Sequence, residues 1–189
     1  MREHSSVDLD EYLHALPVRQ LFPPQRDVPT RYAAPGWPLL KSFNGFSGAE
    51  RRRGGQLVAW LLAAGCLAKP EQCDICASRS QLGFHGENYY DLRCYPVLCR
   101  SCHHALHLRA YQWDAWRRIV DAAATTGSEW FVLGPRHGFD LAQHLRDKFG
   151  WSVADIERSA LSPLSEAIKA RLPTDMWLHP YLHPQPTCG

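Results

Sequence analysis

Apolar residues recur at helical spacing in the first half of this chain, and polar residues mark where the helix begins. The apolar face consists of Leu57, Val58, Leu61 and Leu62. The sequence Ser47-Gly48-Ala49-Glu50 has the spacing of a capping box, and Gly65 can end a helix. This pattern predicts a helix from about residue 48 to residue 64, with Arg51, Arg52 and Arg53 in its first turns.

The same periodicity predicts that most of the second half is helical. A stripe of Trp113, Trp116, Ile119 and Val120 indicates a helix over 111–124, which continues or restarts one that begins near Cys102. Three further helices are expected at 139–149, 152–160 and 163–172. Gly150 closes the first of these, and in the last Ser162 is the expected cap with Pro163 at the first helical position.

Three other stretches do not fit a helix. Residues 81–98 are rich in Tyr, Phe and Val and predict a β-hairpin. Residues 17–38 hold six prolines, which predicts an extended arm that lies over the surface or is disordered. The tail at 173–189 repeats Leu-His-Pro, which predicts a mobile terminus, with metal binding by its histidines as the alternative.

Four of the seven cysteines form two C-x-x-C knuckles with 22 residues between them: Cys73 and Cys76, then Cys99 and Cys102. This spacing can bring four thiolates to one tetrahedral ion, so we expect a structural Zn²⁺. Disulfides or four unrelated core cysteines are the alternative. The charged N-terminus lacks an apolar export segment, which favours zinc in a reducing cytoplasm. A Cys₃His site that uses His103 or His107 is a variant.

The elements expected here follow one another in the order of a knuckle, a hairpin, a second knuckle and a helix. This order predicts a treble-clef zinc finger. The expected fold class is α+β, mainly α, with the treble clef embedded among helices. The expected organisation is a proline-rich N-terminal arm at 1–46, a zinc-binding core with its preceding helix at 47–126, C-terminal helices at 127–172 and a Pro/His-rich tail at 173–189. No apolar run approaches the roughly 18 residues of a membrane span, so we expect no membrane partner.

Net charge does not identify a partner. The formal charge is +2 with cysteine counted as neutral. Four thiolates with one Zn²⁺ contribute about −2, which brings the total near zero. Binding to nucleic acid would therefore require a local basic patch.

The segments around the second knuckle resemble a known family. His85-Gly86-Glu87-Asn88-Tyr89 and Leu98-Cys99-Arg100-Ser101-Cys102-His103-His104-Ala105-Leu106-His107 are similar in content and interval to the HNH (ββα-metal) endonucleases. The resemblance covers residues 73–107 and implies structural zinc on the four cysteines. It also implies a catalytic divalent ion, Mg²⁺ or Mn²⁺, at His85, His103 and His107, where it would polarise the scissile phosphate. Residues 103 and 107 are four apart and share a helix face, whereas His104 points elsewhere.

The chain departs from this family where water is activated. The general-base histidine falls on Gly86, and the asparagine that orients it falls near Cys94. A shift of one residue makes His85 the base but puts Phe84 in the place of a metal ligand. A general base typically contributes about 10²–10⁴-fold, so we expect strongly impaired cleavage unless Glu87 or His104 substitutes. The alternative is that the three histidines are packing or second-shell residues of a zinc module.

We therefore predict an HNH-like zinc-binding protein that binds nucleic acid, DNA rather than RNA, with weak or no nuclease activity. The expected phosphate contacts are Arg51, Arg52, Arg53, Arg93, Arg100 and Arg109. An active metal-dependent HNH endonuclease is one alternative. A zinc-stabilised module with a protein partner is the other.

Overall fold

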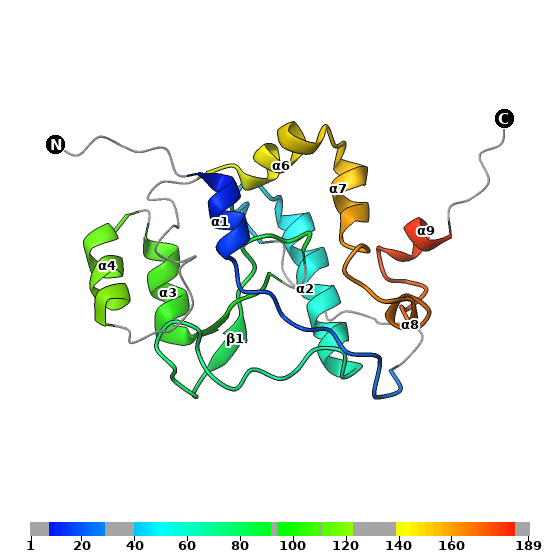
Figure 1. Cartoon of the computed structure of the whole chain (residues 1–189), viewed down its shortest axis with the longest axis horizontal. Coiled ribbons are helices and arrows are strands. Elements are labelled where there is room, and N and C mark those ends of the chain that lie inside the picture. The colour runs from blue at the N-terminus through cyan, green and yellow to red at the C-terminus, as the bar shows by residue number, and fades with distance from the viewer. Residues whose placement is uncertain (1–7, 29–39, 92–93, 110, 123–138, 184–189) are drawn as a thin grey trace.

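The computed structural model describes residues 8–28, 40–91, 94–109, 111–122 and 139–183. In chain order the elements are α1 (Leu9–Ala15), α2 (Gly48–Ala63), β1 (Leu82–Phe84), β2 (Val97–Cys99), α3 (Arg100–Leu108), α4 (Trp113–Ala122), α6 (Leu141–Phe149), α7 (Val153–Ser159), α8 (Glu166–Lys169) and α9 (His179–Leu182). Figure 1 shows β1, α3 and α4 at one end of the molecule, α8 and α9 at the other, and α1 and α2 between them. The described chain is thus mainly helical, with one small antiparallel sheet.

Helix α2 confirms the helix predicted from the apolar face and the capping box. The Ser47 side chain accepts a hydrogen bond from the Glu50 backbone, and the Glu50 carboxylate accepts one from the Ser47 backbone. Gly65 follows the helix with a φ of +72°, a conformation that favours glycine. Gly54 does not break the helix: a Cβ there would lie 2.5 Å from the Tyr95 hydroxyl, so its absence allows close packing.

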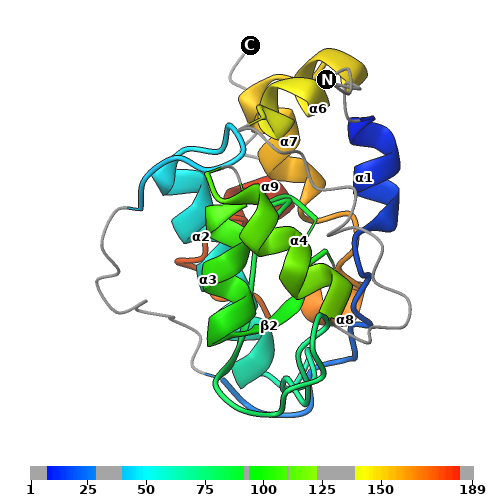
Figure 2. The same ribbon diagram turned by 90° about the vertical axis from the view of Figure 1, so that its left-hand side faces the viewer.

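The apolar side chains form two clusters. The larger one surrounds α2 and includes buried residues of α6, α7 and α8 together with Met176 and Leu178. The smaller one joins α1, the cysteine knuckles, α3 and α4. Figure 2, which views the molecule from the α3 end, shows α3 and α4 on its outer face.

The N-terminal region is not only an extended arm. Helix α1 was not predicted; it is capped by Asp8 and buries Tyr12, which is fully enclosed in the smaller cluster. Residues 17–28, which follow, form no helix and run along the surface as expected, whereas residues 29–38 of the predicted arm lie outside the described residues. The Phe22 N–H donates to the Cys66 carbonyl at 2.8 Å, and the Gln25 N–H donates to the Ala64 carbonyl at 2.9 Å. These bonds fasten the arm to the chain that leaves α2.

The C-terminal region differs from the prediction in two places. The last predicted helix is reduced to the four residues of α8, and its cap is Ser165 rather than Ser162. The described part of the tail is not a free terminus, because Met176 is 4% exposed and Leu178 is fully buried against the larger cluster. Among the described residues, no helix is long and apolar enough to cross a membrane.

Candidate metal centres

The two cysteine knuckles are brought together by the small sheet. The predicted hairpin is present as the antiparallel pair β1 and β2, with Leu82 opposite Cys99. Each strand has only three residues, and a long segment joins them. Asp74, in the first knuckle, exchanges two 2.7 Å hydrogen bonds with Val97: its N–H donates to the Val97 carbonyl and its carboxylate accepts the Val97 N–H. The Arg19 guanidinium also pairs with the Asp74 carboxylate.

The four predicted cysteines converge at metal-binding distance. The sulfur atoms of Cys73, Cys76, Cys99 and Cys102 all lie within 4.8 Å of one another. The Cys76 and Cys99 sulfurs are 3.7 Å apart. A disulfide would need about 2.05 Å, whereas Zn–S bonds of about 2.3 Å at tetrahedral angles place two sulfurs about 3.8 Å apart. The hydrogen bond between Cys73 and Cys102 lowers the pKa of Cys73 and raises that of Cys102, so the thiols share protons that a bound zinc ion would displace. The donor set therefore fits a structural zinc ion.

A second group of donors consists of His85, His103 and His107, here called the histidine cluster, whose ligand atoms also lie within 4.8 Å of one another. His85 follows β1 directly, and its N–H donates to the Pro96 carbonyl at 2.8 Å, which extends the ladder by one residue. His103 and His107 lie on one face of α3, as their spacing predicts. The sheet and the helix thus place the three rings together.

The ring nitrogens of the three histidines face one another at hydrogen-bond distance. His85 Nδ1 and His107 Nε2 lie 2.9 Å and 3.0 Å from His103 Nε2. His85 Nε2 lies 2.7 Å from a Glu87 carboxylate oxygen, so a neutral His85 carries its proton there and turns a lone pair toward the cluster. One proton on His103 Nε2 would have to be shared between two acceptors. A cation among the three lone pairs satisfies all of them.

The surroundings of His103 and His107 keep these two rings in the form that binds metal. Partial removal from water lowers the pKa of both to about 4, with smaller effects from nearby charges. Both rings are therefore neutral at pH 7, as a metal-ligating imidazole must be.

Glu87 supports the cluster from within the protein. It is fully buried and receives hydrogen bonds from Arg109 at 3.0 and 3.3 Å and from Asn44 at 2.7 Å, in addition to His85. Burial alone would raise its pKa, but the Arg109 charge and the His85 hydrogen bond hold the pKa well below its usual value. A carboxylate that accepts the far N–H of a histidine is a common support for a metal ligand.

These contacts exclude one conditional role and correct one expectation. Glu87 cannot substitute for the missing general base, because Arg109, Asn44 and His85 occupy both of its oxygens. Arg109 is not a nucleic-acid contact, because it is 4% exposed and paired with Glu87.

A tight turn before α2 supplies further contacts that the sequence reasoning missed. Phe43 and Phe46 exchange two backbone hydrogen bonds of 3.0 Å across Asn44-Gly45, and both central residues have positive φ. An Asn-Gly pair between aromatic residues is the sequence signal for such a turn. The turn points Asn44 at Glu87 and lays the Phe43 ring against His85 and His107, with ring centroids 5.6 and 5.1 Å apart.

An aromatic ring fills the space beside Gly86, where the family resemblance would put a general base. A Cβ on Gly86 would lie 2.6 Å from Cε1 of Tyr89. Tyr89 is 7% exposed, and its hydroxyl accepts a 3.0 Å hydrogen bond from Nε of Arg51. A histidine at position 86 would need this ring to move.

The remaining predicted arginines lie in different settings. Arg53 pairs with Glu157 and stacks near Trp177, so its guanidinium has an internal partner. Arg52, which lies between Arg51 and Arg53 on α2, is partly buried. Arg100 is exposed at the start of α3. Arg93 lies outside the described residues.

An open depression of about 540 Å³ lies beside the histidine cluster. Its lining is Arg100, Ser101, His103, His104 and His107. His104 therefore faces this hollow although it lies off the face shared by His103 and His107.

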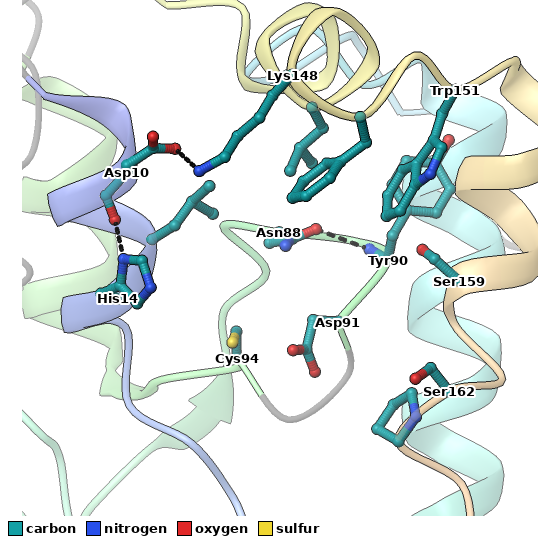
Figure 3. Close-up of a pocket in the computed structure, with 14 residues that line it drawn as sticks. Asp10, His14, Asn88, Tyr90, Asp91, Cys94, Lys148, Trp151, Ser159 and Ser162 are labelled. Atoms are coloured by element: carbon teal, nitrogen blue, oxygen red, sulfur yellow. Dashed lines mark hydrogen bonds and ion pairs between the residues drawn. The ribbon is translucent and has the colours of Figure 1, made fainter.

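A separate cavity of about 360 Å³ lies between α1, the segment that follows Glu87, and α6 (Figure 3). Its polar groups largely satisfy one another. Lys148 pairs with Asp10, His14 bonds to the Asp10 carbonyl, and Asn88 accepts the Tyr90 N–H.

No protein-family model matches the chain, and neither a curated protein nor a solved structure matches it. The likeness to HNH endonucleases therefore rests on residues 73–107, and the function has to be argued from the two centres.

Proposed function

We propose that this protein binds nucleic acid on a treble-clef zinc scaffold that carries a second divalent ion at the histidine cluster, and that it cleaves phosphodiesters weakly or not at all. The observation that carries the proposal is the convergence of three imidazole nitrogens beside the buried carboxylate of Glu87. Three imidazole nitrogens gathered around one point are the arrangement that a metal ion requires, which supports the proposal.

Each part of the cluster has a distinct task in this proposal. His85, His103 and His107 hold the ion, while Glu87 fixes the tautomer and orientation of His85. A divalent ion at this position would polarise a phosphoryl oxygen. Arg51, Arg52 and Arg100 remain as candidate phosphate contacts.

The donor set bears on which ion is bound. Mg²⁺ and Mn²⁺ prefer oxygen ligands, whereas imidazole suits Zn²⁺, Ni²⁺ and related transition metals. Three imidazoles therefore favour Zn²⁺, Ni²⁺ or a related later transition-metal ion over the Mg²⁺ or Mn²⁺ implied by the family resemblance.

Weak cleavage follows from what surrounds the cluster. Tyr89 fills the space next to Gly86, and a phenol hydroxyl that accepts a hydrogen bond from a cation is a poor base at neutral pH. Glu87 is ionised but enclosed, so it cannot reach a water molecule on the open side. His104 is the remaining neighbour of the hollow that could accept a proton.

The test measures binding and cleavage on the same metal-loaded protein. Anisotropy of a labelled duplex should report binding that weakens with salt, with a log–log slope of about −2 to −3 for two or three phosphate contacts. Nicking of supercoiled plasmid should stay near background. His107→Ala should lower metal-dependent binding, whereas His104→Ala, a matched change three residues earlier on α3, should leave it unchanged.

The alternatives predict different results. Robust nicking that His107→Ala abolishes would establish the active endonuclease. An absence of binding to DNA and RNA at low salt would refute nucleic-acid binding and favour the protein-interaction module.

A further inference from the structure

Arg51 belongs to α2, which carries none of the three histidines, yet it lies close to the histidine cluster. The Arg51 guanidinium carbon lies 5.3 Å from the centre of the Phe43 ring, and that ring contacts both His85 and His107. Arg51 thus lies one aromatic ring away from the candidate metal site.

The Arg51 guanidinium is held in place without being neutralised. Its Nε donates to the Tyr89 hydroxyl and its Nη1 donates to the Lys41 carbonyl. Its planar group also lies over two aromatic rings, 5.3 Å from the centre of Phe43 and 5.5 Å from that of Tyr89. Within the described part of the chain, Nη2 has no partner and no carboxylate pairs with Arg51, whereas Arg53 and Arg109 both have acidic partners.

Tyr89 links this arginine to the missing base. Its ring fills the space that a side chain at position 86 would need, and its hydroxyl fixes Arg51. An arginine stays protonated and cannot activate water, but its planar donors match the oxygens of a phosphate. Beside Gly86, the Tyr89-anchored arginine therefore offers an anion-binding group that cannot accept a proton.

We infer that Arg51 binds a phosphate group held at the histidine cluster, and that Tyr89 positions Arg51 for this contact. The inference rests on the proposed function, because the same site must also hold a metal ion. The ligand chemistry is a phosphate oxygen anion, whether it comes from an internal phosphodiester or from a terminal phosphate. Arg51 thereby differs from Arg52, which the same helix carries one residue later.

The experiment compares Arg51→Gln with Arg52→Gln, which removes the same charge from the neighbouring position. The proteins are loaded with Co²⁺ at the histidine cluster after the cysteine site is filled with Zn²⁺, so that visible absorption reports metal binding independently. The probes are inorganic phosphate, a labelled DNA oligonucleotide with a 5′-phosphate and the same oligonucleotide with a 5′-hydroxyl.

We expect Arg51→Gln to keep the cobalt spectrum but to weaken oligonucleotide binding about tenfold or more and to reduce the salt slope by about one. Arg52→Gln should weaken binding by a clearly smaller factor than Arg51→Gln, because Arg52 lacks the anchored contact. A preference for the 5′-phosphate, lost in Arg51→Gln, would identify a terminal phosphate as the ligand. Equal loss for both oligonucleotides would identify the internal phosphodiester.

Tyr89→Phe separates a contact from a folding defect. This variant keeps the ring that packs on Gly86 and removes only the hydroxyl that orients Arg51. It should weaken phosphate binding by a smaller factor than Arg51→Gln with little change in melting temperature. The inference is overturned if cobalt binds and both Arg51→Gln and Arg52→Gln retain wild-type affinity, or lose it equally. Failure of cobalt to bind the wild-type cluster would instead refute the proposed function.

Discussion

Replacing Glu87 by Gln should destabilise the fold more than any change to a surface ion pair. The Arg109 guanidinium, 4% exposed, would lose its only buried counter-charge among the described residues. The new amide NH₂ would also face a donor, either the His85 ring N–H or the Asn44 amide. Removing one partner of a buried ion pair costs about 3–5 kcal/mol.

Urea unfolding in zinc-saturated buffer measures this cost. With a slope of about 2 kcal/mol per molar urea, the midpoint should fall by about 2 M. Glu166→Gln is the matched control: its ion pair with Lys169 is exposed at the Glu166 side chain, so its loss should cost about 0–1 kcal/mol. The double variant Glu87→Gln/Arg109→Met should be more stable than the sum of its single changes by about 1–3 kcal/mol. The reasoning would be refuted if Glu87→Gln lost no more unfolding free energy than Glu166→Gln. It would also be refuted if the loss in the double variant equalled the sum of the two single losses.

Three further predictions concern other parts of the molecule. Removal of the cysteine-bound zinc should unfold the protein around it, because structural zinc contributes about 10–16 kcal/mol and a domain's stability is about 5–15 kcal/mol; an unchanged circular-dichroism melt after verified zinc release would contradict this. Gly54→Ala should lower the melting temperature, because its Cβ would lie 2.5 Å from the Tyr95 hydroxyl, although alanine gains up to about 1 kcal/mol of helix propensity; a higher melting temperature would show that this contact does not matter. Burial raises the pKa of Glu50, but hydrogen bonds from Tyr90 and Ser47 outweigh it and lower the pKa below 4.5. Ionised Glu50 therefore stabilises the fold above pH 4.5 and loses this effect as the pH falls through its lower folded-state pKa. Urea unfolding should thus show a cost of Glu50→Gln at pH 7 that shrinks as the pH is lowered below 4.5.

The sequence was most informative where local spacing determines the geometry. The capping box and the apolar face of α2 need only neighbouring residues, and so do the C-x-x-C knuckles and the pair His103 and His107. His85 could be assigned to the same place because β1 must pair with the strand that leads into α3. These elements follow from rules that act over a few residues.

The sequence was least informative where distant segments meet. Whether Glu87 was a free base or a buried support depended on Arg109 and Asn44, which no spacing rule connects to it. Arg109 was taken for a surface cation for the same reason. Helix α1 has only seven residues, too few for a convincing apolar period, and it is held by Tyr12 inside the smaller cluster.

The central claim is that the chain holds two metal ions, one on four cysteines and one on three histidines. Native mass spectrometry of the protein titrated with Zn²⁺ counts them directly. The account predicts two tightly bound ions in the wild-type protein and one in the variant His103→Ala/His107→Ala, with folding retained because the cysteine site remains filled. A wild-type protein that binds a single zinc ion, or a double variant that still binds two, would contradict the account.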